Sequence, residues 1–219
     1  MTDHLTDRPF IVWKCGASLD GRIAAADGTS QWITSAEARA DAHRLRAECG
    51  AVMVGSGTQE ADNPHLAVRD AEADRQPLRI VVDSNARTPA DARVLDDAAP
   101  TLIAVADDAD ASHLKGRADI VRLPRSDAGL DLHLLLKALG ERGVTSVLLE
   151  GGPTLAGSFL AAGLIDRVVA YIAPVLIGGG GKSAIAGPGA ANIADAKRFQ
   201  LEDVTRIGSD VRLTAAPLR

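Results

Sequence analysis

Short apolar runs alternate with helix-like segments along this chain, and that alternation limits the folds it can form. Strands interleaved with helices indicate an α/β fold with a mostly parallel central sheet. Phe199–Ile207 and Asp210–Thr214, on either side of Gly208-Ser209, predict a closing antiparallel hairpin, so the sheet should be mixed. The other runs that predict strands are Phe10–Cys15, Ala51–Val54, Leu78–Val82, Thr101–Ala106, Ile120–Leu123, Val144–Leu149 and Arg167–Ile172.

Helices are predicted from caps and apolar stripes. Thr34-Ser35-Ala36-Glu37 has the form of a capping box and predicts a helix to about Cys49, with Ala38, Ala42, Leu45 and Cys49 on one face. Leu132, Leu135, Leu136 and Leu139 form a helical stripe. A further helix should run from Pro153 to about Ala162 and end at Gly163.

Length and composition narrow the class of protein. The 219 residues fit one domain, 1–219, with 1–8 as a disordered tail and Ala67 to Gln76 as a surface loop. A net charge of −5 argues against nucleic acid as a partner. No apolar run is long enough to span a membrane, and the polar N-terminus is not a signal peptide. With two cysteines outside any metal or redox spacing, we expect reduced thiols and a cytoplasmic location.

The most informative motif is Val147–Leu155, in which a strand ends in Glu150-Gly151-Gly152 and a helix begins with Pro153. The first amides of a helix lack partners within the helix and lie at the positive end of its dipole, so they suit a dinucleotide pyrophosphate. A plain glycine-rich turn explains the motif equally well. Glu150, at the carboxyl end of the strand, is either a ligand-binding carboxylate or a partner of the helix dipole.

Other motifs are less specific. Gly55-Ser56-Gly57-Thr58 is a second strand-to-glycine turn, but it matches the dinucleotide fingerprint only in part. Asp62-Asn63-Pro64 predicts a turn, in which Asp62 is either a functional carboxylate or a turn residue. The scattered histidines form no metal-binding spacing, and the signatures of zinc deaminases and serine esterases are absent from the sequence. We therefore expect no metal.

Several motifs, in order, resemble one family. They are Lys14–Arg22, Ser30–Ser35, Val54–Thr58, Asp62–Pro64, Leu149–Leu155 and Ala173–Gly178. Together they closely resemble the reductase domain of the bifunctional riboflavin biosynthesis deaminase/reductase, from about Pro9 to Leu213. Cys15 and Asn63 depart from the family pattern, which leaves an altered substrate choice open. The chain begins where the deaminase domain of these relatives would already have ended.

The resemblance implies a dihydrofolate-reductase-like three-layer fold, NADPH as hydride donor and a homodimer. The implied reaction reduces the ribosyl group of 5-amino-6-(5-phosphoribosylamino)uracil at C1 to the ribitylamino product. Lys14, Asp62 and Glu150 are the implied catalytic residues. The implied substrate contacts are Ser30, Arg46, Leu66, Arg69 and Glu150. The implied cofactor contacts are Gly16, Trp32, Thr58, Asp62, Ser84, Gly152, Pro153, Thr154, Leu155, Ala156, Gly157 and Ser158.

Arg46 and Arg69 suit a ribose phosphate, because the arginine fork matches phosphate geometry. Ser84 follows a strand where the resemblance places the adenosine 2′-phosphate, and Arg87 is either its cation or a surface residue. Two alternatives remain open. One is a reductase of the same fold acting on dihydrofolate or another pterin-like substrate, and the other is a non-catalytic nucleotide-binding module. The sequence leaves undecided whether deamination precedes reduction, whether NADH replaces NADPH, and whether a separate deaminase exists.

Overall fold

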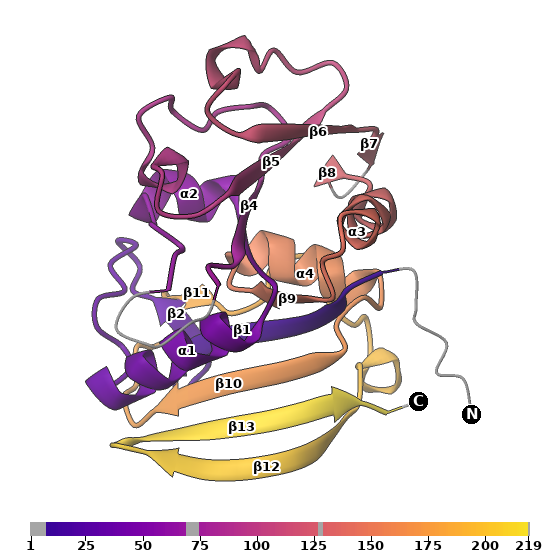
Figure 1. Ribbon diagram of the computed structural model, residues 1–219. Helices are drawn as coiled ribbons and strands as arrows, with labels where there is room; N and C mark the ends of the chain where they lie inside the picture. Colours follow the sequence, from indigo (N-terminus) through magenta and orange to yellow (C-terminus); the bar gives the residue numbers. More distant parts are fainter. Residues whose placement is uncertain (1–7, 69–74, 127–128, 219) are drawn as a thin grey trace, which may run out of the picture. The chain divides into compact units, whose positions relative to one another are not determined.

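The structure is a computed structural model that describes residues 8–68, 75–126 and 129–218 (Figure 1). Its chain forms two compact units, each built from two stretches of sequence. Unit 1 comprises Met1–Phe10 and Arg46–Gly151, and unit 2 comprises Ile11–Leu45 and Gly152–Arg219.

Unit 1 contains a parallel sheet in the order β9-β3-β4-β5-β6. Its strands consist almost entirely of aliphatic side chains, and Val52, Met53 and Ile80 are 0% exposed. Runs of this kind are typical of parallel strands that are covered on both faces. The strands are β3 (Ala51–Gly55), β4 (Leu78–Val82), β5 (Thr101–Ala106), β6 (Asp119–Leu123) and β9 (Ser146–Leu149), with a separate pair formed by β7 (Arg125–Ser126) and β8 (Gly129–Leu130).

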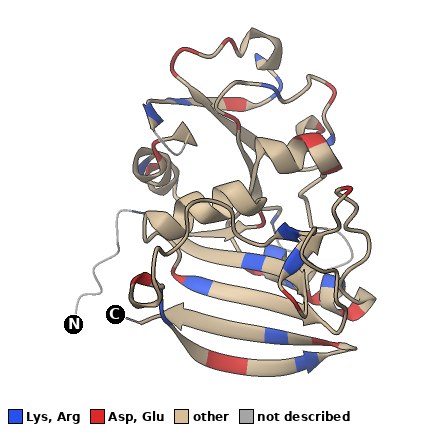
Figure 2. Cartoon of the chain, turned by 180° about the vertical axis from the view of Figure 1, so that it is seen from behind, with Lys and Arg blue, Asp and Glu red and all other residues tan. Residues whose placement is uncertain are grey.

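Unit 2 contains a mixed sheet. Strand β1 (Phe10–Ser18) pairs in parallel with β10 (Arg167–Ala173). Strand β13 (Asp210–Pro217) pairs antiparallel with both β10 and β12 (Phe199–Ile207), and these strands lie side by side in Figure 1. Cationic and anionic side chains are interspersed along β12 and β13 (Figure 2). A short second sheet joins β2 (Arg22–Ala24) to β11 (Lys182–Ser183).

The helices are α1 (Ala36–Glu48), α2 (Ser56–Asp62), α3 (Leu132–Glu141) and α4 (Pro153–Ala161), with single 3-10 turns η1 (Arg93–Leu95), η2 (Ser112–Leu114) and η3 (Ile193–Asp195). Helix α3 buries the predicted leucine stripe, because Leu132, Leu135, Leu136 and Leu139 are all buried. None of the helices among the described residues is long and apolar enough to cross a lipid bilayer.

A buried polar cluster fixes α1 within unit 2. The carboxylate of Asp41 accepts hydrogen bonds from the Tyr171 hydroxyl on β10 (2.7 Å) and from Arg212 on β13 (2.9 Å). Burial, followed by this hydrogen bond to Asp41, raises the pKa of Tyr171. The cluster satisfies the buried charge of Asp41. Of the apolar face predicted for this helix, Ala38 is buried, whereas Ala42, Leu45 and Cys49 are half-buried.

Most of the predicted elements are confirmed. The α/β fold, the mixed sheet and the C-terminal antiparallel pair are present. Strands β4 and β5 have the predicted bounds, and α4 begins at Pro153 and is followed by Gly163 with φ +67°. Both cysteines are free.

The capping prediction for α1 was wrong. The helix begins at Ala36, so Ser35 is the residue before it, and the Ser35 hydroxyl accepts from the Ala38 amide (3.1 Å). Glu37 does not reach back to Thr34, because its carboxylate lies against Gly208.

Two loop predictions also need correction. Gly55–Thr58 is not a simple turn, because α2 begins directly after Gly55. Ala67 and Val68 were assigned to a surface loop but are 1% and 6% exposed. The rest of that loop up to residue 74, and the predicted tail except Arg8, lie outside the described residues.

Candidate functional site

The predicted glycine-rich turn leads into α4 without a side-chain cap. Gly152 is the N-cap, with extended backbone at φ −61° and ψ 173°, and Pro153 occupies the first turn. The backbone amides of the first turn of a helix have no intrahelical acceptor, and here no side chain of the cap replaces one. This N-terminus has the geometry expected of an anion site. The glycines of the turn would allow a phosphate to approach the backbone closely.

The residues of α4 predicted to contact a cofactor differ in their surroundings. Thr154 is exposed, and its carbonyl accepts from the Ser158 hydroxyl (3.1 Å). Ala156 is 0% exposed. Gly157 faces the Ala186 backbone so closely that a Cβ atom would lie 1.9 Å from the Ala186 oxygen. The glycine is therefore required for the packing of the 186 segment on α4.

Unit 2 also holds the predicted residues of β1 and of the segment before α1. Lys14 and Gly16 are half-buried on β1, and a Cβ at Gly16 would lie 3.1 Å from Thr34 Cγ2. The Trp32 side chain is 68% exposed, and the Arg39 guanidinium lies 4.2 Å from the centre of its ring. The Ser30 carbonyl accepts from the Ile33 amide (3.1 Å). Arg39 thus covers one face of the exposed Trp32 ring, and the rest of the ring could contact a planar ligand.

In unit 1 the structure brings together Arg46, at the end of α1, and Glu150, just after β9. Arg46 Nε donates to Glu150 Oε1 (2.5 Å), and Nη2 donates to Oε2 (2.9 Å). The side chains are only 15% and 8% exposed. Burial opposes the charge on Arg46, but Glu150 outweighs it and holds the pKa of the guanidinium above its ordinary value. The pair is a bidentate, charge-assisted contact, which fixes the orientation of both groups.

The predicted residues of α2 lie on a short helix that directly follows β3. Thr58 is half-buried in its first turn, and Asp62 is its exposed last residue. Asn63 caps the helix in the left-handed region (φ +40°), and Asp62, which was predicted to lie in a turn, is helical instead. Leu66 follows with φ +59° and an exposed fraction of 2%. Arg69, the other predicted phosphate contact, lies outside the described residues.

Ser84 follows the carboxyl end of β4, as predicted. Arg87, the candidate cation for a 2′-phosphate, is already engaged, because it donates to the Ser56 hydroxyl (3.0 Å) and pairs with Glu60 (3.0 Å). The Glu60 carboxylate reduces the positive potential that Arg87 can offer to a phosphate. The geometry therefore argues against Arg87 as the cation that binds a 2′-phosphate.

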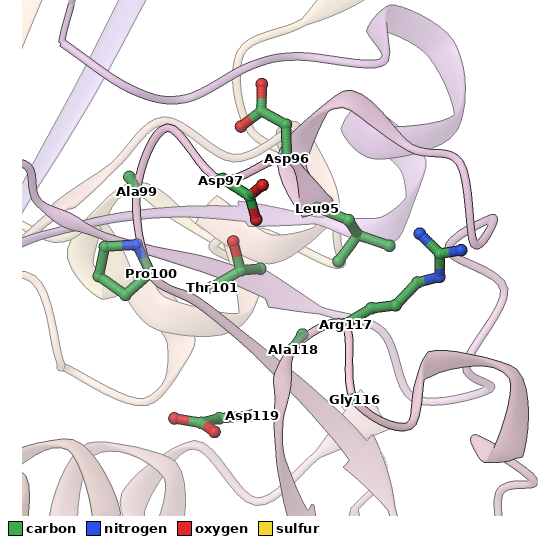
Figure 3. A pocket seen from close by; sticks show the side chains of 10 residues that line it. All are labelled: Leu95, Asp96, Asp97, Ala99, Pro100, Thr101, Gly116, Arg117, Ala118 and Asp119. Carbon is green, nitrogen blue, oxygen red and sulfur yellow. The ribbon is translucent and has the colours of Figure 1, made fainter.

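A cavity of about 460 Å³ lies elsewhere in unit 1 (Figure 3). Its lining includes Thr101 and Asp119, which are the first residues of β5 and β6. Ser84 and Glu150 follow the carboxyl ends of parallel strands, where ligands bind in open α/β sheets. The cavity thus belongs to the opposite edge of this sheet, and its lining includes none of the predicted site residues.

Sequence reasoning missed several buried charged side chains, namely Asp41, Arg79, Asp83 and Asp210. Arg79 stands in the apolar run of β4 and is 0% exposed. An arginine within a run of β-branched and aliphatic residues was the available signal, because such a charge is buried only with partners. The described residues contain no group of three or more histidine, cysteine or acidic side chains that would hold a metal ion.

Comparison with known proteins places these features in a family. The family model of the RibD C-terminal domain matches residues 9–213. The riboflavin biosynthesis protein RibD of Mycobacterium tuberculosis is 43% identical over 212 residues, covering 95% of this chain and 55% of that protein. The chain thus spans about half the length of that curated relative.

An archaeal reductase of similar length and a solved bacterial structure are also similar to this chain. The 2,5-diamino-6-ribosylamino-4(3H)-pyrimidinone 5′-phosphate reductase of Methanothermobacter thermautotrophicus is 41% identical over 210 residues, covering 93% of this chain and 96% of that protein. The solved structure of Acinetobacter baumannii RibD, form 1, has a TM-score of 0.86 and 32% identity, covering 98% of this chain and 59% of that one.

A more distant structure confirms the predicted fold type. Dihydrofolate reductase from Enterococcus faecalis has a TM-score of 0.55 with 11% identity, covering 96% of this chain and 97% of that one. At this identity the similarity shows the dihydrofolate-reductase-like fold alone.

Proposed function

Because the chain belongs to the RibD C-terminal domain family, we propose that it is an NADPH-dependent reductase of riboflavin biosynthesis. Its substrate is 5-amino-6-(5-phosphoribosylamino)uracil, which is reduced at C1 of the ribosyl group to the ribitylamino product. The observation that carries the reductase activity is the 41% identity to the archaeal reductase over 96% of that protein's length, an enzyme named for the undeaminated pyrimidinone phosphate. The uracil substrate follows the Thermotoga maritima enzyme, 28% identical, whose name includes 5-amino-6-(5-phosphoribosylamino)uracil reductase. The uncapped N-terminus of α4 and the Arg46–Glu150 pair support the proposal.

When bound, NADPH would supply the hydride for this reaction. The uncapped N-terminus of α4 fits the pyrophosphate of such a cofactor, because backbone amides and the helix dipole favour anions there. The proposed cofactor contacts in unit 2 are Gly16, Trp32 and Gly152–Ser158, among which Ala156 and Gly157 shape the helix rather than offering side chains. Those in unit 1 are Thr58, Asp62 and Ser84.

The reaction requires proton transfers and an oriented pyrimidine, and we assign these roles to different polar residues. The ribosylamine first opens to an imine: the bond between C1 and the ring oxygen breaks, the amine nitrogen gives up its proton as the C1–N double bond forms, and the ring oxygen takes a proton. Addition of hydride to C1 and of a proton to nitrogen completes the reduction. We assign the proton transfers to Lys14 or Asp62 and the orientation of the pyrimidine to Glu150. The bidentate contact with Arg46 fixes the orientation of the Glu150 carboxylate.

The remaining substrate contacts concern the phosphate and the ribose. We propose Arg46, Arg69, Ser30 and Leu66 for this role. Arg46 has an acidic partner in this structure, so its share in phosphate binding is additional to its contact with Glu150. We also propose that the protein is a cytoplasmic homodimer, which sedimentation analysis of the purified chain would test.

The decisive experiment is NADPH oxidation, followed by absorbance, with different substrates side by side. They are the deaminated ribosylaminopyrimidine phosphate, its undeaminated precursor and dihydrofolate. Turnover of the deaminated compound supports the proposal, and turnover of the precursor alone keeps the reductase but reverses the order of deamination and reduction. Turnover of dihydrofolate alone, or of none of these compounds, contradicts it.

A further inference from the structure

The segment Asn63–Val68 forms neither helix nor strand, yet its backbone is closely constrained. It leaves α2 through Asn63, whose side-chain oxygen accepts from the Arg93 amide (3.0 Å). Leu66 then adopts φ +59° although it has a branched side chain, and it is 2% exposed. A non-glycine residue pays a conformational cost in this region and keeps it only where the surroundings hold it.

Arg79 holds the first half of this segment. Its guanidinium, 0% exposed, donates to the His65 carbonyl (3.4 Å), to Asp96 Oδ1 (2.7 Å) and to the carbonyl of Asp96 (2.5 Å). It also donates to the Ala99 carbonyl. Hydrogen bonding from Arg79 holds the pKa of Asp96 at about 2. Burying a cation is costly unless its donors find acceptors. Here Nη1 and Nη2 bind carbonyls and one carboxylate of two irregular segments, whereas the buried Nε has no hydrogen-bond partner among the described residues.

Asp96 also contacts the side chain of His65, the residue whose carbonyl accepts from Arg79. Asp96 Oδ2 lies 2.6 Å from His65 Nε2. His65 is therefore held at both its carbonyl and its ring, directly before Leu66. Both contacts lie within unit 1.

Gln76 holds the second half. Its side-chain oxygen accepts from the Val68 amide (2.9 Å), and its side-chain nitrogen donates to the Val68 carbonyl (3.2 Å). One amide side chain thus satisfies both backbone groups of Val68, as a neighbouring strand would. Leu66 lies between these two fixed points.

We propose that Arg79, Asp96 and Gln76 are positioning residues of the substrate site, which hold Leu66 where it contacts the pyrimidine or ribose. This inference rests on the proposed function, because it takes Leu66 as a substrate contact. None of the three residues touches the reacting atoms, and they act through the backbone of His65 and Val68. Arg79 is fully buried, so Gln76 is the better residue for a test.

The test compares Gln76→Ala with Gln76→Glu in the full chain. The alanine removes both bonds to Val68, and the glutamate keeps the acceptor but loses the donor. We expect Gln76→Ala to raise KM for the ribosyl substrate about tenfold, roughly the effect of one or two neutral hydrogen bonds. Gln76→Glu should fall between this and the wild type. The dissociation constant for NADPH, measured by fluorescence without substrate, and kcat should change much less.

A matched control is Gln200→Ala, on the exposed face of β12. It should leave both constants unchanged. Circular dichroism identifies any variant that does not fold, and if Gln76→Ala fails, Gln76→Glu decides alone. An unchanged KM in the folded Gln76 variants, or an equal weakening of substrate and NADPH, overturns the inference. A wild-type chain without reductase activity instead contradicts the proposed function itself.

Discussion

At the scale of single residues, the contact between Arg46 and Glu150 joins positions that are 104 residues apart in sequence. Both side chains are more than four-fifths buried, so solvent screens their attraction only weakly. Each residue was predicted from the sequence as a separate site residue. Their partnership was not predictable, because it depends on the end of α1 lying beside the end of β9 within unit 1.

We expect Glu150→Gln to lower kcat/KM for the ribosyl substrate by about tenfold to a hundredfold, in line with the loss of a hydrogen bond to a charged group. The neutral amide keeps the shape of the side chain but leaves the charge of Arg46 unbalanced. Steady-state kinetics check this prediction. Glu202→Gln serves as the control, because the Glu202 side chain, which pairs with Arg167, is 38% exposed. Equal kcat/KM in both variants would contradict the proposed role of Glu150.

Gly157 allows a test of packing at a single atom. A Cβ there meets the Ala186 backbone at 1.9 Å, whereas one at Gly179 meets nothing within 4 Å. We expect Gly157→Ala to reduce the free energy of unfolding by about 1–3 kcal/mol, the usual cost of overpacking. Gly179→Ala should have little effect. Denaturant unfolding measures both, and a similar stability of the two variants would show that the 186 segment yields easily.

At the scale of elements, the pattern of residues predicted what local physics determines. The aliphatic runs of β4 and β5 gave their exact bounds, because a buried strand has a largely apolar sequence, to which Arg79 in β4 and Thr101 in β5 are exceptions. Helix α2 was missed because its short sequence, Ser56–Asp62, carries glycine and no apolar stripe. The buried course of Ala67 and Val68 was missed because their anchors, Arg79 and Gln76, are recognisable only in the folded chain.

The cap of α1 is a prediction at this scale. The Ser35 hydroxyl accepts from the Ala38 amide, so Ser35→Ala should reduce the free energy of unfolding by about 1 kcal/mol. Ser35→Asp retains an acceptor and should restore most of that loss. Thermal unfolding of the two variants and the wild type measures these differences in stability. If Ser35→Ala is as stable as the wild type, the hydroxyl does not cap this helix.

At the scale of the whole molecule, stability should depend on pH through carboxylates that are hydrogen-bonded in the fold. Asp20 accepts from the Ser18 hydroxyl (2.6 Å) and from the amides of Ile177 (3.1 Å) and Gly178 (2.7 Å). These bonds, with that of Ser18 the strongest, lower its pKa from 3.8 to about 2. Asp20 thereby ties the end of β1 to the glycine run that begins at Gly178.

A lowered pKa in the fold means that the unfolded chain binds the proton more tightly. The stabilisation from Asp20 is therefore complete above pH 3.8 and is lost as the pH falls through about 2. We expect the wild type to be more stable than Asp20→Asn at pH 7, with the difference shrinking between pH 4 and pH 2. Denaturant unfolding across this range measures it. A difference that stays constant would show that Asp20 does not contribute through its charge.

The pairing of β3 with both β4 and β9 has a consequence for the order of assembly during synthesis. β12 and β13 are neighbours in sequence and can pair as soon as Gly208 allows the chain to turn back. β3 can pair with β4 soon after both strands are synthesised. Its other edge stays unpaired until β9 is synthesised, because Ala51 pairs with Val147. Contacts so distant in sequence form slowly. The emerging chain therefore carries an open strand edge, the kind of surface on which misassembly between nascent chains begins.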